Sequence, residues 1–173
     1  MHPRAAELID VLGLHPHPEG GYFAEVYRSA STVTPDDDRD SRAALTTIYF
    51  LLVEGQISVW HRVRSDEVWH FYEGEPLALT WTDAHGANAV TQILGPVGAD
   101  HTPVGVDQSP VAVVPAGCWQ TARPRRARPA GAYTLVGCTV APGFEYEDFE
   151  LVADGSEIGE ALRQCLPEPA NGL

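Results

Sequence analysis

The stretch "HRVRSDEVWHFYEG", residues 61 to 74, alternates apolar and polar side chains on both sides of a short polar turn. This period of two predicts two antiparallel strands joined by a tight turn. On the first strand, His61 shares a face with Val59 and Val63, and this apolar company predicts that the imidazole points inward. If Glu67 lies across the hairpin from His61, an imidazole and a carboxylate share the interior and shift each other's pKa.

Short strands are predicted on both sides of this hairpin. Runs of four to nine residues rich in Val, Ile, Thr, Tyr, Phe and Trp are separated by Gly, Pro, Asp and Asn. No amphipathic helical stretch lies between these strands, and a parallel α/β sheet needs a helix between successive strands. The pattern therefore predicts an antiparallel sandwich or barrel. The clearer strands are Tyr22–Arg28, Leu45–Leu52, Ile57–Val63, Glu67–Tyr72, Leu77–Trp81, Val90–Leu94, Val111–Val114, Tyr133–Val140 and Phe144–Leu151.

Two short helices are expected at the ends of the chain. Apolar residues recur at helical spacing over about 4–12 and about 155–166, with Gly13 and Pro167 as the respective stop signals. We therefore expect residues 1–173 to form one domain, with a β-structured core over about 20–152.

The composition of the chain argues for a globular protein that does not bind nucleic acid or anionic membranes. The chain has 173 residues, 44% of them hydrophobic, which is enough for one sizeable core, and a formal net charge of −13 argues against binding nucleic acid or anionic membranes. Three cysteines without a CxxC pair suggest reduced thiols. Because no signal peptide and no long apolar run is seen, we expect a cytoplasmic protein. The basic stretch "ARPRRARPAG", residues 122–131, is either a solvated loop or a clamp for an anionic ligand.

Several sequence blocks resemble a known family. The order His61, Val63, Glu67 and Gly74, followed by "PAGCWQ" at 115–120, resembles the two-part signature of the cupin superfamily. The blocks "HPHPEGGYFAEVYRS", "TTIYFLL", "SVWHRVRSDEVWHFYEGEPLAL", "VPAGCWQTA" and "YTLVGCTVAPGFEYEDFEL" are similar to the DUF985 (Cupin_5) branch. This resemblance implies an all-β fold, the cupin jelly-roll β-barrel, with a small-molecule pocket inside it and a homodimeric assembly.

The resemblance also implies positions for a metal site. His61 matches the first cupin histidine and Glu67 the glutamate, whereas Val63 and Gln120 stand where two further histidines are expected. A divalent metal ion held by His61, Glu67 and Gln120, with water in the open positions, is one interpretation, although an amide oxygen is a poor substitute for imidazole.

Metal-free proton transfer is the other interpretation, because cupin-like sugar epimerases use a histidine base and a tyrosine acid. By that type of chemistry, His61 is the base, Glu67 orients it and Tyr72 is the acid, with Tyr22, Tyr49 and Tyr133 as alternative acids. The function predicted is an isomerase, epimerase or lyase acting on a small polar or sugar-like molecule. The alternatives are a non-catalytic binding or sensing cupin and a metal-dependent enzyme with an atypical His/Glu/Gln site.

Further residues are expected to bind the ligand or to shape its pocket. Trp69 and Trp119 adjoin motif positions and could wall an apolar cavity. The remaining expected ligand-binding residues are His70, Gln120, Arg28, Tyr49 and Tyr133. The segment "HPHPEGGYF", residues 15–23, is interpreted as a rigid turn that delivers the next strand, with metal binding by its two histidines as the less favoured alternative.

Overall fold

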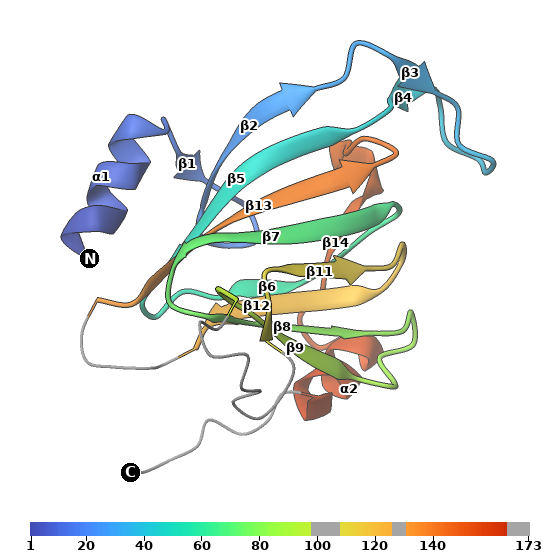
Figure 1. The fold of residues 1–173 in the computed structure, drawn as a ribbon. Helices are drawn as coiled ribbons and strands as arrows, with labels where there is room; N and C mark the ends of the chain where they lie inside the picture. Colours follow the sequence, from blue (N-terminus) through green and yellow to red (C-terminus); the bar gives the residue numbers. More distant parts are fainter. Residues whose placement is uncertain (98–107, 126–130, 166–173) are drawn as a thin grey trace.

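The structure is a computed structural model that describes residues 1–97, 108–125 and 131–165. Two six-stranded sheets face each other, and one helix packs on the outside of each (Figure 1). The elements are α1 (Pro3–Val11), β1 (His15–Pro16), β2 (Tyr22–Arg28), β3 (Thr32–Val33), β4 (Arg42–Ala43), β5 (Thr46–Val53), β6 (Ser58–Val63), β7 (Asp66–Gly74), β8 (Leu77–Thr82), β9 (Val90–Leu94), β10 (Gln108–Ser109), β11 (Val111–Val114), β12 (Trp119–Pro124), β13 (Tyr133–Ala141), the 3-10 turn η1 (Tyr146–Asp148), β14 (Phe149–Leu151) and α2 (Glu157–Cys165).

The expected all-β jelly roll with terminal helices is confirmed. The first sheet has the strand order β1-β2-β5-β13-β7-β11, and the second has β10-β9-β8-β12-β6-β14. Among the described residues no ladder joins the two sheets, so they form a sandwich of two facing layers instead of the closed barrel that we expected. Arg126, Arg128 and Leu166, to which the sequence predictions also extended, lie outside the described residues.

The core lies between the two sheets. Strand alternation turns Phe50, Leu52 and Trp69 of the first sheet toward Leu77 and Leu79 of the second, and each of these side chains is almost fully buried. This apolar layer fills one part of the interior. Buried polar side chains, among them His61, Glu67 and Gln120, occupy the other part.

The two helices cover the outer faces of the sheets. Leu8 of α1 packs against Leu51 and Leu135 on the first sheet, whereas Leu162 of α2 packs against Trp60 and Trp119 on the second. Trp119 therefore belongs to an outer layer, and its neighbour Gln120 is the residue of β12 that points inward.

The strands on either side of the 64–65 turn lie in different sheets. In β6, His61 pairs with Gln120 and Leu151 of the second sheet, whereas in β7, Glu67 pairs with Val114 and Val140 of the first sheet. The prediction that His61 and Glu67 face each other across a hairpin ladder was wrong in this respect. They reach the same interior from opposite layers.

The segment that follows β13 also differs from expectation. Residues 144–151 were predicted to be one edge strand, but they form η1 and the short strand β14. The reason is Asp148, which is buried and accepts hydrogen bonds from the guanidinium groups of Arg42 and Arg39. This ion-pair cluster draws the chain inward and keeps Tyr146 beside the opening between the sheets.

Gly20 confirms the predicted turn before β2. Its φ is 104°, and a Cβ at this position would lie 2.4 Å from the carbonyl oxygen of Ile57. Only glycine adopts this conformation and allows this approach without strain. The turn therefore packs tightly against the chain just before β6, which brings Glu19 next to that strand.

Replacing Arg42 with Met should lower the free energy of unfolding by about 3 kcal/mol, because it leaves the buried Asp148 carboxylate without its main partner. The control is Arg163→Met, whose exposed pair with Glu160 should contribute less than about 1 kcal/mol. Urea unfolding followed by tryptophan fluorescence measures both. Equal small losses would show that the Arg42–Asp148 pair does not anchor this segment.

Candidate functional site

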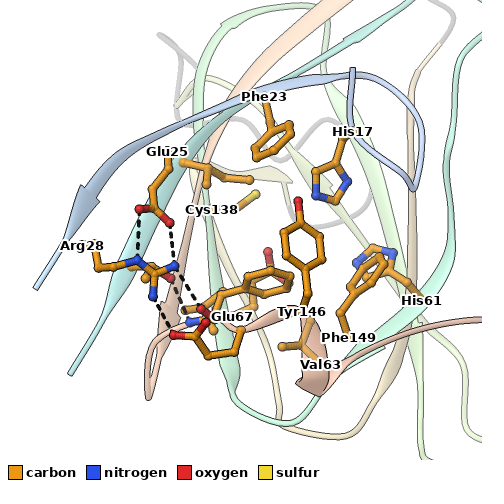
Figure 2. A pocket seen from close by; sticks show the side chains of 15 residues that line it. His17, Phe23, Glu25, Arg28, His61, Val63, Glu67, Cys138, Tyr146 and Phe149 are labelled. Carbon is orange, nitrogen blue, oxygen red and sulfur yellow. Dashed lines mark hydrogen bonds and ion pairs between the residues drawn. The ribbon is translucent and has the colours of Figure 1, made fainter. Parts of the chain in front are cut away.

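A cavity of about 90 Å³ opens between the two sheets at the end where η1 lies (Figure 2). This volume is several times what one ordered water needs. Polar and aromatic side chains from both layers line it. The lining residues are His17, Phe23, Glu25, Arg28, Thr46, Ile48, His61, Val63, Glu67, Cys138, Val140, Phe144, Glu145, Tyr146 and Phe149.

Both ring nitrogens of His61 have polar neighbours. The side chain is 2% exposed, and Nδ1 lies 2.8 Å from the carbonyl oxygen of Val59, so it carries the proton and donates it there. Nε2 is then the acceptor nitrogen of the neutral ring, and it lies 3.3 Å from Oε2 of Glu19. Burial lowers the pKa of His61, which favours this neutral form.

Glu19 is the carboxyl group that accompanies His61. It is 6% exposed, and the hydroxyl of Ser58 donates to its Oε1 at 2.9 Å. Burial raises the pKa of Glu19 to about 8, so its carboxyl group is mostly protonated at neutral pH and can donate to Nε2 of His61. His17 lies 3.5 Å from the same carboxyl group, and burial lowers the pKa of His17 to about 4.

Gln120 joins Glu67 to Trp69 across the gap between the sheets. The indole N–H of Trp69 donates to Oε1 of Gln120 at 3.1 Å, and Nε2 of Gln120 donates to Oε2 of Glu67 at 2.5 Å. Because an indole can only donate, this contact determines which end of the amide faces Glu67. Burial raises the pKa of Glu67, whose carboxyl group also lines the cavity.

The mouth of the cavity carries an exposed charge cluster and three aromatic rings. Arg28 donates through Nε and Nη2 to Glu25 at 3.1 and 2.9 Å, and through Nη1 to Glu145 at 2.7 Å. This cluster ties β2 to the segment that carries Tyr146. The rings of Phe144, Tyr146 and Phe149 lie together on that segment.

The structure brings some of the predicted site residues together. His61, Glu67 and Arg28 line the cavity, and Gln120 and Trp69 stand directly behind Glu67. Glu67 and Trp69, which alternation places on one face of β7, therefore both point inward.

Other predicted residues lie away from the cavity. The hydroxyl of Tyr72 sits over Gly137, its ring contacts Tyr49, and the side chain is 50% exposed on the outer face of the first sheet. Alternation places His70 on that face too. Tyr133 donates to Glu73 near α1, and Trp119 packs under α2. Tyr72, Tyr49, Tyr133, His70 and Trp119 therefore do not line this cavity, because each belongs to an outward face of its strand, and their role in ligand binding stays a prediction.

Sequence reasoning missed Glu19 and Tyr146, and it weighed His17 only as a metal ligand. The "HPHPEGGYF" turn was interpreted as a rigid entry to β2, which is correct for the backbone. Its acidic residue, however, is directed into the interior and not into solvent. A glutamate between a proline and two glycines was the only signal, and it does not indicate a direction.

The predicted metal ligands do not fit a divalent ion. Both ends of the Gln120 amide are engaged by Trp69 and Glu67, which leaves its oxygen directed at an indole N–H. His61 presents Nε2 to Glu19. Among the described residues, no group of three His, Cys, Asp or Glu side chains is arranged to hold a metal.

Comparisons with known proteins define the class. Two facing sheets of this topology with a polar interior form the cupin fold, and the chain matches the sequence family described as Cupin superfamily (DUF985), Cupin_5, over residues 6–152. The chain belongs to this family. No curated protein matches it.

Solved structures agree with this assignment. A protein from Shewanella oneidensis is 33% identical, with a TM-score of 0.73, over 86% of this chain and 84% of that chain. A hypothetical protein from Leishmania major is 30% identical, with a TM-score of 0.76, over 92% and 97%. Oxalate decarboxylase from Bacillus subtilis, a protein described with Mn(II) centres, shares the fold at 14% identity and a TM-score of 0.50, over 80% of this chain and 30% of that chain.

In the described part of the chain, no helix has the length and apolar character needed to cross a membrane.

The pKa of Glu19 predicts how stability depends on pH. Because this pKa rises from its ordinary value of 4.5 to about 8 on folding, the folded state holds a proton that the unfolded state releases, and stability falls as pH rises through this range. His17, with a lowered pKa, opposes this trend only below about pH 6.5. Between pH 6.5 and 8 the protein should lose roughly 1 to 2 kcal/mol through Glu19.

Urea unfolding at several pH values tests this. In Glu19→Gln the loss between pH 6.5 and 8 should shrink by that amount, while the loss due to Glu67 remains. An unchanged slope in the variant would show that Glu19 is ionised in the folded protein.

Proposed function

We propose that the protein binds a small polar molecule in the cavity between its sheets and performs proton-transfer chemistry on it, as an isomerase, epimerase or lyase. The observation that carries this proposal is Glu67. Its carboxyl group is 7% exposed, lines the cavity and is held by Gln120 through one oxygen. Burial raises its pKa, and a carboxyl group with a raised pKa is suited to both accept and return a proton near neutral pH.

In this proposal the proton passes through Glu67 and not through His61, to which sequence reasoning had given that role. Nδ1 of His61 donates to a backbone carbonyl, and Nε2 faces Glu19. A base needs a free lone pair directed at the substrate, whereas both nitrogens of this ring have a polar neighbour within the protein. His61 is therefore a positioning residue that holds Glu19 and forms one wall.

Tyr146 takes the place that Tyr72 held as the candidate acid. Figure 2 shows its ring inside the cavity with the hydroxyl directed toward the side of His17. A phenol that lines the same cavity as Glu67 supplies the second proton-transfer group that epimerisation or β-elimination requires. Tyr146 lies on η1, which the Arg42–Asp148 pair anchors.

A non-catalytic binding or sensing protein is the second candidate. It is favoured by the polar neighbours of both His61 nitrogens, because a ring whose nitrogens already face protein groups is better suited to shape a binding site than to react. A metal-dependent enzyme has the support of the Mn(II) centres described for oxalate decarboxylase, but that likeness concerns the fold alone, and the donor groups here do not fit.

Deuterium exchange separates the two candidates. A ligand is first selected by the rise in melting temperature that it causes. The wild-type protein in D2O should then introduce deuterium into a C–H bond of that ligand, as read by NMR or mass spectrometry. Glu67→Gln should slow this exchange by at least about a hundredfold, because it removes the proton acceptor. The amide of Gln120 can still donate to the new side chain, so the fold should persist.

The matched control is Glu147→Gln, because Glu147 is an exposed carboxylate on η1 that does not line the cavity. It should exchange at the wild-type rate. Full exchange in Glu67→Gln would contradict the assignment of Glu67. A stabilising ligand that the wild-type protein leaves unlabelled would favour the binding protein.

A further inference from the structure

The described lining of the cavity carries more acidic than basic groups. It contains three carboxyl groups, Glu25, Glu67 and Glu145, and one guanidinium, Arg28. All three nitrogens of that guanidinium already donate to Glu25 and Glu145. Burial lowers the pKa of both His17 and His61, so both rings are neutral at pH 7. An anionic ligand would enter against an excess of negative charge.

The same mouth carries three aromatic rings that contact one another. The ring centroids of Phe144 and Tyr146 are 5.1 Å apart, those of Phe144 and Phe149 5.9 Å, and those of Tyr146 and Phe149 6.4 Å. Their planes stand at 82°, 63° and 86° to one another, so the rings meet edge to face, and the parts of them that no neighbouring ring covers line the cavity. The negative face of an aromatic ring attracts an organic ammonium group, and such groups are commonly bound by several rings together.

The exposed fraction of these side chains decreases from the mouth of the cavity to its interior. Tyr146 is 56% exposed and the side chain of Glu145 41% exposed, whereas Glu67 is 7% exposed. A ligand that enters this cavity meets the rings and the carboxylates of the mouth first. Its other end reaches Glu67.

We infer that the ligand of this cavity is a small organic cation whose substituted ammonium group sits against Phe144, Tyr146 and Phe149, beside the carboxylates of Glu25 and Glu145. This inference rests on the proposed function, because it names the class of molecule on which Glu67 acts. A hard metal cation is a poor alternative occupant of the mouth, since aromatic rings do not replace the oxygen ligands that it requires. A neutral polyol would leave the ring faces and the surplus carboxylate without a partner.

Isothermal titration with choline, at moderate ionic strength, tests the charge. Its uncharged isostere 3,3-dimethylbutan-1-ol has nearly the same shape and size, so the difference in affinity isolates the positive charge. Choline should bind at least about tenfold more tightly than the isostere, because both the rings and the carboxylates favour the cation. Equal affinities, or no choline binding at all, would overturn the inference.

Two substitutions at Tyr146 test the rings. Tyr146→Leu keeps the apolar volume but removes the aromatic face, and it should weaken choline binding by about three- to tenfold. Tyr146→Phe keeps the face and should bind choline as the wild-type protein does, even though it removes the hydroxyl assigned to proton transfer. Unchanged binding in Tyr146→Leu would place the cation elsewhere and overturn the assignment.

Glu145→Gln provides an independent test of the mouth. It removes one carboxylate and releases one nitrogen of Arg28, so choline should bind about threefold or more weakly, while the isostere is unaffected. The proposed function and the cationic ligand can be distinguished. If a neutral or anionic compound gains deuterium in a Glu67-dependent manner, the proton-transfer function is upheld and the cationic ligand is overturned.

Discussion

The amide of Gln120 is the interaction on which the candidate site depends. It lies between the two sheets, 1% exposed, and connects the indole of Trp69 to the carboxyl group of Glu67. A buried amide without partners would cost several kcal/mol, but with both ends paired it holds the layers in one register. The hydrogen bond from Gln120 fixes the direction of the Glu67 carboxyl group, whereas burial is what raises its pKa.

The other components of the site come from segments outside the central strands. The turn before β2 places Glu19 against His61, and η1 places Tyr146 at the mouth. Each segment is secured by its own constraint: the approach of Gly20 to the backbone at Ile57 for the first, and the buried pair of Arg42 with Asp148 for the second. The strands of the two sheets therefore form the inner wall of the cavity, and these two segments add the Glu19 carboxyl group and the Tyr146 ring.

Membership of the DUF985 family explains the architecture but not the chemistry, since one fold supports many reactions. In this chain burial lowers the pKa of the interior histidine and raises the pKa of the neighbouring Glu19, and the amide at position 120 is part of a hydrogen-bonded chain. In the proposed function these features assign the proton transfer to Glu67 in place of His61, and the carboxylates of Glu25 and Glu145 give the mouth its negative character. The net charge of −13 is in keeping with a cationic ligand but does not itself define a site.

The sequence alone determined the all-β class, the terminal helices and, through the resemblance, the family. It also predicted that His61 points inward, because alternation with a period of two specifies the face of a strand, whereas Glu67 and Gln120 were placed by their match to the cupin signature. Only the tertiary structure decided which strands face each other. It placed β6 and β7 in different sheets, paired His61 with Glu19 and turned Tyr72 outward. Periodicity is a local property, whereas the partner of a buried group depends on which distant segment the packing of the layers brings to it.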